Sequence, residues 1–249
     1  MIIEFIGCTG AGKTTLIAHV QRRLVQEASV TTSFTLVASP LGLRNVTNPT
    51  ARHLIQEFIG FPSFIRSLYR HKAFIIFILR MLARQADFSV FMMNNLRSLV
   101  RKISVYEMTK RRQHNQIVLV DEGTVLLAHN IFVYSSALYT AEEIARFASL
   151  VPLPDMIMYV KAPMETLVQR TLLRADPPRE IKSRNQELIE KQINRAVRMF
   201  DQLVKAENIQ SRLLIVENPE LNEHQYDVLV NEIVEFIMNY KPVGKMSNI

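Results

Sequence analysis

The sequence predicts an α/β protein in which helices cover both faces of a parallel sheet. Short apolar runs alternate with amphipathic stretches along the 249 residues, the first run leads into a glycine-rich turn, and the third ends in two acids. Strands that alternate with helices pair in parallel, because each helix provides the crossover between two strands. The length suits one generous domain over residues 1–249.

Five apolar runs are the expected strands, and helical stretches separate them. The runs are Ile2–Ile6, Phe34–Ala38, Ile117–Val120, Met156–Val160 and Leu213–Val216. A helix is expected from Lys13 to about Glu27. Thr140 followed three residues later by Glu143 is the pattern of a capping box, which predicts the start of another helix.

The composition excludes several classes of protein. With 48% hydrophobic and 21% charged residues, the chain is neither disordered nor low in complexity. Cys8 is the only cysteine, which excludes a disulfide framework and a cysteine zinc site. The start of the chain lacks a basic leader, and the apolar run Ala73–Leu79 falls far short of the ~20 residues that span a bilayer. We therefore expect a cytoplasmic protein.

Residues 50–115 interrupt the strand–helix alternation and read as two or three long, inserted helices. Between Phe61 and Asn115 there are eleven basic and two acidic residues, a local charge of +9 against +7 for the whole chain. The basic character is therefore local, and it favours anionic partners such as nucleotides, phosphorylated metabolites, nucleic acid or acidic lipid.

The strongest chemical signal is the segment Gly7–Thr14, which reads GCTGAGKT and matches the P-loop pattern G-x-x-x-x-G-K-[ST]. It follows a strand and opens a helix, so its backbone N–H groups can surround phosphates at the helix N-terminus. Lys13 is expected to reach the β- and γ-phosphates, and Thr14 to ligate Mg²⁺. The residues predicted to bind the cofactor are Gly7, Cys8, Thr9, Gly10, Ala11, Gly12, Lys13, Thr14 and Thr15. The helix N-terminus could also lower the pKa of Cys8 for a redox role, although a structural role is favoured.

The second signal is the apolar strand Ile117–Val120, which ends in Asp121 and Glu122. An acid at the end of such a strand supplies the Mg²⁺-side carboxylate of a nucleotide site, and Asp121 is the candidate. Glu122 would then face the reacting groups and serve as a general base for an acceptor hydroxyl or for water.

The third signal is a series of arginines at 170, 174 and 179. Arg170 and Arg174 are four residues apart and are expected to share one helix face, after which Asp176-Pro177-Pro178 begins a loop. Arginines on a lid over residues 174–184 can neutralise a transferring phosphoryl group. The alternative is a solvated basic helix end.

Together these features resemble a P-loop kinase of the nucleoside and nucleotide kinase group, and they are most similar to thymidylate-kinase-like proteins. Val160–Arg170 is similar to the strand, proline and arginine helix that lead into the lid of that family, and Asn185–Glu207 resembles its next long helix. The resemblance implies a P-loop NTPase three-layer sandwich with a five-stranded parallel sheet in the order 2-3-1-4-5. It also implies ATP and Mg²⁺ as cofactors, and lid arginines at Arg174 and Arg179.

The acceptor side departs from the family. Gly123 stands where the family has an arginine after the acid. The segment after the second predicted strand is Ser39–Arg44, where the family often has a Glu-Pro-Gly segment that helps to bind the acceptor. The basic lining predicts a small anionic acceptor, for which Arg44 and Arg97 are the candidates. The resemblance does not name the acceptor.

Three functions compete on the sequence alone. The first is a small-molecule kinase that moves the γ-phosphoryl group of ATP·Mg²⁺. The second is a P-loop ATPase that acts on a partner. The third is a module that binds nucleic acid or membrane through the basic helices 61–115, although Phe61–Leu82 favours an apolar face packed on the sheet with basic residues outside. The sequence leaves open whether the inserted helices form a homodimer interface, a substrate lid or a membrane contact.

Overall fold

The chain folds around a five-stranded parallel sheet in the order β2-β3-β1-β4-β5, as expected. The computed structural model describes residues 1–84, 90–134, 139–174, 185–220 and 222–241. The strands are β1 (Ile2–Ile6), β2 (Val30–Thr32), β3 (Ile117–Val120), β4 (Met156–Lys161) and β5 (Leu213–Glu217). Central β1 pairs in parallel with β3 on one side and with β4 on the other, so the ends of β1 and β3 lie side by side.

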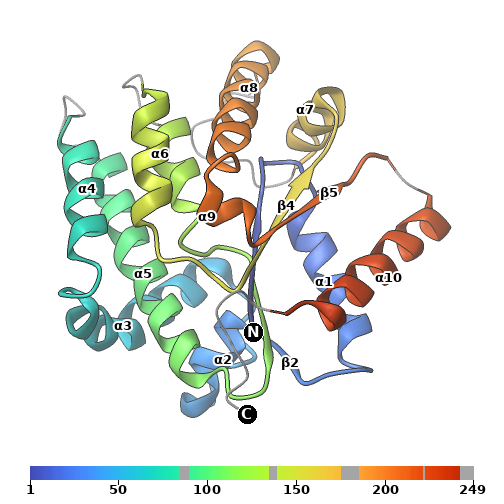
Figure 1. Cartoon of the computed structure of the whole chain (residues 1–249), viewed down its shortest axis with the longest axis horizontal. Coiled ribbons are helices and arrows are strands. Elements are labelled where there is room, and N and C mark those ends of the chain that lie inside the picture. Colours follow the sequence, from blue (N-terminus) through green and yellow to red (C-terminus); the bar gives the residue numbers. More distant parts are fainter. Residues whose placement is uncertain (85–89, 135–138, 175–184, 221, 242–249) are drawn as a thin grey trace.

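Helices flank the sheet and complete the P-loop NTPase architecture (Figure 1). They are α1 (Lys13–Leu24), α2 (Ser33–Ala38), the short η1 (Ser39–Leu41), α3 (Pro49–Ser67), α4 (Lys72–Ala83), α5 (Val90–Arg112), η2 (His129–Val133), α6 (Ala141–Leu150), α7 (Met164–Leu172), α8 (Gln186–Leu203), α9 (Glu207–Gln210) and α10 (Glu223–Asn239). In Figure 1, α1 and α10 lie on one side of the sheet and α3 to α6 on the other. Within the described residues, no helix is both long enough and apolar enough to cross a bilayer.

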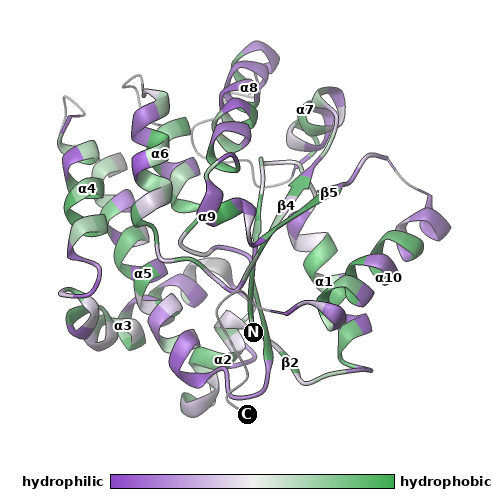
Figure 2. Ribbon diagram, in the orientation of Figure 1, coloured by the Kyte–Doolittle hydropathy of each residue, from purple (hydrophilic) through white to green (hydrophobic). Residues whose placement is uncertain are grey.

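The core lies between the sheet and these helices. Every residue of β1 is buried, as are Met156–Val160 of β4, because both faces of the central strands are covered. Figure 2 shows the hydrophobic strands enclosed by helices that mix hydrophobic and hydrophilic residues. The capping box at the start of α6 forms as predicted, with Thr140 and Glu143 bonding reciprocally.

The second strand was wrongly placed by the sequence pattern. The expected strand Phe34–Ala38 is the helix α2, and the strand is the preceding Val30–Thr32. The Thr32 hydroxyl accepts a hydrogen bond from the Thr35 amide at 3.2 Å, which is an N-cap and starts a helix. The helical spacing then buries Phe34, Val37 and Ala38 together.

After α2 and η1, the long helices α3 to α5 fill the rest of the interval between β2 and β3. Helix α4 buries Phe74, Ile78 and Leu82, as expected of an apolar face packed inside. Helix α3 does not follow that expectation, because Phe61 and Ile65 on its outer face are 55% and 50% exposed. That the whole chain forms one domain, with residues 50–115 as an insertion, stays a prediction.

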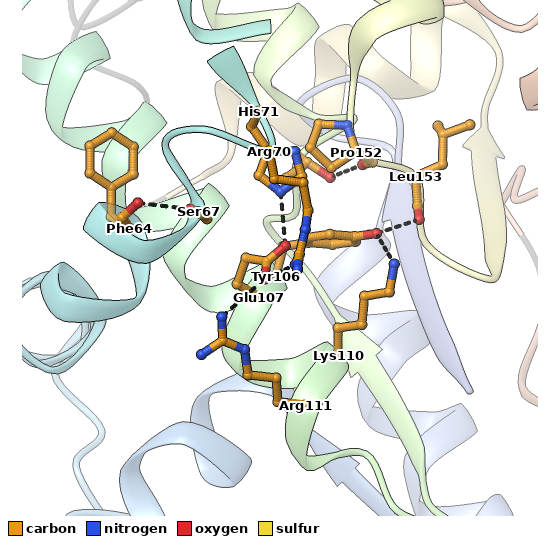
Figure 3. A network of polar contacts seen from close by, with 11 residues as sticks. Phe64, Ser67, Arg70, His71, Tyr106, Glu107, Lys110, Arg111, Pro152 and Leu153 are labelled. Carbon is orange, nitrogen blue, oxygen red and sulfur yellow. Dashed lines mark hydrogen bonds and ion pairs between the residues drawn. The ribbon is translucent and has the colours of Figure 1, made fainter. Parts of the chain in front are cut away.

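A polar network fixes the turn between α3 and α4 against α5 (Figure 3). The Glu107 carboxylate is 1% exposed and accepts from Arg70 at 2.7 Å and from His71 Nε2 at 2.8 Å. Arg111 lies 3.5 Å away. Burial alone would raise the pKa of Glu107, but the bonds from His71 and Arg70 outweigh burial and lower it. The charged carboxylate therefore holds the three helices together.

Candidate active site

The P-loop segment Gly7–Thr14 connects β1 to α1 and turns sharply at its glycines. Gly7, Gly10 and Gly12 have φ values of +140°, +82° and +85°, which side chains rarely allow. Gly10 is also enclosed, since an added Cβ would lie 2.5 Å from the Leu167 carbonyl oxygen. The glycine pattern predicted from the sequence is therefore required by both conformation and space.

Lys13 and Thr14 begin α1 at the bottom of a pocket. Lys13 Nζ donates to the carbonyl oxygens of Gly7 at 2.8 Å and Cys8 at 2.9 Å, so its ammonium lies inside the turn. Burial lowers the pKa of Lys13, and Asp121 opposes this by favouring the charged form. Thr14 Oγ1 donates to Asp121 Oδ2 at 2.9 Å. The structure thus brings together the two residues predicted to ligate Mg²⁺.

Glu122 follows Asp121 at the end of β3 and faces the same pocket. Its carboxylate lies 3.1 Å from Arg101 Nη2 and 3.8 Å from His53 Nε2. Burial would raise the pKa of Glu122, but Lys102, Arg101 and His53 together outweigh burial and lower it. Glu122 is therefore charged at neutral pH.

Arg101 and Lys102 of α5 are site residues that the sequence analysis counted as basic but did not single out. Lys102 is 2% exposed, and burial lowers its pKa to about 8 against the attraction of Glu122. Arg101 reaches both Glu122 and Glu57. No local motif marks these residues, because α5 reaches the site only through its packing in the fold.

The pocket has a volume of about 930 Å³ and two unlike walls. One wall is the P-loop with Asp121 and Glu122. The other comes mainly from α3, α5 and η2 and is lined by Thr50, His53, Glu57, Asn94, Arg97, Ser98, Arg101, Lys102, His129 and Asn130. The structure therefore has one large, open pocket that the P-loop and these helices line together.

The two predicted acceptor arginines differ in position. Arg97 lines the pocket, where its guanidinium donates to Glu57 Oε2 through Nε at 3.0 Å and Nη2 at 2.8 Å. Arg44 is exposed and is not among the residues that line the pocket. The sequence could not separate the two, because their difference depends on how α3 and α5 pack.

Of the arginines predicted in and before the lid, two lie within the residues that the structure describes. Arg170 of α7 lines the pocket, but its guanidinium also donates to the carbonyl oxygens of Asn218 at 3.2 Å and Pro219 at 3.0 Å. Arg174 lines the pocket two residues beyond the end of α7. Arg179 and most of the predicted lid lie outside the described residues.

Asn218 supports the P-loop from the end of β5, and sequence reasoning missed it. Its Nδ2 donates to the Ala11 carbonyl oxygen at 2.8 Å, and its side chain fills the space where a Cβ on Gly12 would lie. Because Arg170 holds the Asn218 carbonyl, the loop after β5, α7 and the P-loop form one connected unit.

Two titratable side chains near the P-loop are neutral. Burial lowers the pKa of His129 to about 3, and Lys13 and Lys102 add to this. Cys8 is 3% exposed, and burial raises its pKa to about 12. The suggestion that the helix N-terminus lowers the pKa of Cys8 is therefore wrong, because desolvation of the thiolate is the larger effect.

Comparisons with known proteins bear on the fold. No protein-family model and no curated protein sequence matches the chain. Among solved structures it is similar to a deoxyadenosine kinase from M. mycoides with the products dCMP and a flexible dCDP bound, at a TM-score of 0.52 and 13% identity, over 96% of this chain and 100% of that one. It is also similar to a shikimate kinase from Bacteroides thetaiotaomicron, at a TM-score of 0.46 and 11% identity, over 96% of this chain and 98% of that one. The first likeness, together with the strand order, places the chain in the P-loop NTPase fold.

Proposed function

We propose that the protein is an ATP-dependent phosphotransferase that moves the γ-phosphoryl group of ATP·Mg²⁺ to a hydroxyl group of a small acceptor. The observation that carries this proposal is the two-walled pocket, in which Glu122 lies between the P-loop and a polar wall from α3 and α5. A site for hydrolysis alone needs room for one water molecule beside the nucleotide. The second wall provides far more than that.

The donor side suits ATP and Mg²⁺. The left-handed glycines and the start of α1 direct backbone N–H groups toward phosphate oxygens. In the described residues no cluster of three or more His, Cys, Asp or Glu side chains could hold a metal ion by itself. Mg²⁺ in nucleotide sites uses one or two protein ligands with phosphates and water, so Thr14 and Asp121 fit this role. Bound Mg²⁺ would neutralise charge on the β- and γ-phosphates.

In the proposed reaction, Glu122 is the general base. It accepts the proton of the acceptor hydroxyl as that oxygen bonds to the γ-phosphorus, while the bond from phosphorus to the β–γ bridging oxygen breaks and ADP leaves. Lys13 stabilises the charge that develops on the phosphates. Arg174, Arg170 and, beyond the described residues, Arg179 are proposed to neutralise the phosphoryl group in transfer. Arg101 holds the Glu122 carboxylate at 3.1 Å and orients it.

The acceptor wall favours an acceptor that carries hydroxyl groups and one anionic group. Its cations are Arg97, Arg101 and Lys102, but Glu57 pairs with Arg97 and lies 3.8 Å from Arg101. Glu57, together with Glu122 on Arg101, leaves the wall with less free positive charge than the sequence suggests. Side-chain amides and hydroxyls complete the wall, namely Thr50, Asn94, Ser98 and Asn130. Such groups bond to hydroxyls, so a phosphorylated or carboxylated polyol suits the wall best.

The proposal is tested by following the transfer of labelled γ-phosphate from ATP, with Mg²⁺ present, to a pool of small molecules. The pool contains nucleosides, nucleotides, sugar phosphates and small hydroxy acids. We expect label on an organic acceptor, and a loss of about 10²–10⁴-fold in Glu122→Gln, because a general base contributes that much. Glu232→Gln, an exposed change on α10, is the matched control and should keep full activity. Label released only as inorganic phosphate, with or without the pool, would contradict the proposal and favour a partner-driven ATPase.

A further inference from the structure

The outer face of α3 carries an exposed apolar stripe. Leu54, Phe58, Phe61, Ile65 and Leu68 follow one another at intervals of four, three, four and three residues, which places them on one side of a helix. They are 52%, 87%, 55%, 50% and 37% exposed, and Tyr69 just beyond them is 82% exposed. A sustained stripe of this size on a helix marks an interaction surface rather than scattered surface residues.

The stripe does not take part in the packing of α3 on the rest of the molecule. The opposite side of α3 contacts α5, where an added Cβ on Gly60 would lie 2.5 Å from the Ser104 Cβ, and where Ser67 is 1% exposed. Thr50, His53 and Glu57 of α3 line the pocket. The helix therefore has a packed side, a pocket edge and this separate outer stripe.

The charges around the stripe are basic. Arg66, Arg70 and Lys72 are exposed near its C-terminal end. Between residues 49 and 84 the only acid is Glu57, which is engaged with Arg97. Figure 3 shows that Arg70 shares the single carboxylate of Glu107 with His71 and Arg111, so this end of the surface keeps a positive charge.

We propose that the outer face of α3 and the turn that follows it, from Leu54 to Lys72, dock on an anionic lipid membrane. An apolar helix face with aromatic residues, bordered by Arg and Lys, inserts its side chains at the level of the headgroups while its cations meet anionic lipids. The proposal commits to a membrane surface and does not depend on the reaction that the pocket performs. It replaces the expectation that this apolar face is packed on the sheet.

Charge complementarity favours the membrane over a second copy of the chain. In a parallel pairing of two α3 helices, Arg66, Arg70 and Lys72 would face the same cations. In an antiparallel pairing they would face the N-terminal end of the stripe, where the nearest acid, Glu57, is engaged with Arg97. Neither pairing offers an opposite charge on this face, whereas helix pairs are normally matched by opposite flanking charges. A nucleic-acid duplex would offer phosphates to the cations but no apolar surface to cover Leu54, Ile65 and Leu68.

The test measures flotation of the purified chain with vesicles of phosphatidylcholine mixed with phosphatidylglycerol, and with vesicles of phosphatidylcholine alone. We expect binding to the mixed vesicles that weakens as salt rises, and little binding to the neutral ones. Phe58→Ser with Phe61→Ser should weaken binding about tenfold or more, since each phenyl group loses its apolar burial. Phe236→Ser, which changes another exposed aromatic residue on α10, should have no effect.

The charge contribution has its own pair of variants. Arg66→Gln with Lys72→Gln should weaken binding to the anionic vesicles about tenfold, whereas Lys191→Gln with Lys205→Gln on and after α8 should not. Thermal unfolding checks that each variant is folded. If the Phe58 and Phe61 double variant does not fold, Phe58→Ser alone replaces it in the flotation assay. Failure of the unmodified chain to float would overturn the proposal. A dimer detected by light scattering would also overturn it if the Phe58 and Phe61 changes dissociate that dimer, because a second copy of the chain would then cover the face.

Discussion

Glu4 is a buried carboxyl group that supports the segment after Asp121 and Glu122. It lies in β1, is 2% exposed, and its Oε1 accepts a hydrogen bond from the Leu126 amide at 2.8 Å. Gly123 leaves room for it, since an added Cβ would collide with the Glu4 carboxylate. Burial raises the pKa of Glu4 to about 7, although the Leu126 amide and Lys102 oppose this. The glycine where the resembling family has an arginine is thus explained by a side chain from another strand.

This carboxylate should affect stability over a defined pH range. Between pH 4.5 and about 7 the folded chain binds the Glu4 proton that the unfolded chain has lost, so the free energy of unfolding falls as pH rises. In Glu4→Gln this contribution is absent. We expect the difference in free energy of unfolding, wild type minus variant, to fall by about 3 kcal/mol across that range and to be flat above it.

Denaturant unfolding at a series of pH values measures this difference. The titration of His129 raises the free energy of unfolding as pH rises between about 3 and 6.5. It occurs in both proteins, so it cancels in the difference. Parallel curves for the two proteins would contradict the assignment of Glu4.

At the scale of elements, the close contact of α3 with α5 positions the pocket wall that these two helices form. Gly60 faces Ser104, and both helices contribute side chains to the same wall, with Glu57 of α3 bonded to Arg97 of α5. A larger residue at position 60 would separate the helices and move Glu57. The contact is therefore part of the site although neither Gly60 nor Ser104 lines the pocket.

Gly60→Ala should destabilise the fold by about 1–3 kcal/mol, because the added methyl group overpacks a tight contact. Adding Ser104→Gly should recover part of that loss by making room for it. A double-mutant cycle in denaturant unfolding measures the coupling between the two positions. Additive effects would mean that α3 and α5 tolerate the methyl group by another movement.

At the scale of the whole molecule, the donor half of the pocket joins segments far apart in the chain. Lys13 and Thr14 come from the start of α1 and Asp121 from the end of β3, while Asn218 after β5 supports the P-loop without lining the pocket. A nucleotide bound there contacts several of these segments at once. Binding to the folded state alone should therefore stabilise the entire chain.

ATP with Mg²⁺ at about a hundredfold above its dissociation constant should raise the free energy of unfolding by about 2.7 kcal/mol. Lys13→Met should abolish most of this gain, because Nζ no longer reaches the phosphates, while Lys205→Met at an exposed position should keep it. Asp121→Asn should make the gain independent of Mg²⁺. Thermal unfolding with and without nucleotide measures all three, and an unchanged gain in Lys13→Met would argue against the P-loop site.

The sequence by itself determined the sheet, four of its five strands and the P-loop, because these features depend on local patterns. An apolar run bounded by turns predicts a buried strand, and GCTGAGKT predicts the left-handed glycines that the structure shows. The second strand was misplaced because the short Val30–Thr32 carries little pattern, and the apolar residues after it suit a helix as well as a strand.

Only the tertiary structure decided the other half of the site. Glu57, Arg101 and Lys102 have no motif around them, and they reach the pocket because α3 and α5 pack beside the P-loop. Asn218 likewise contacts the P-loop only because the end of β5 lies next to it. Tertiary packing also decided that Arg97 lines the pocket while Arg44 does not, and that the apolar stripe of α3 faces outward. A periodic pattern predicts that a helix has an apolar face, but which surface that face meets depends on every other element of the fold.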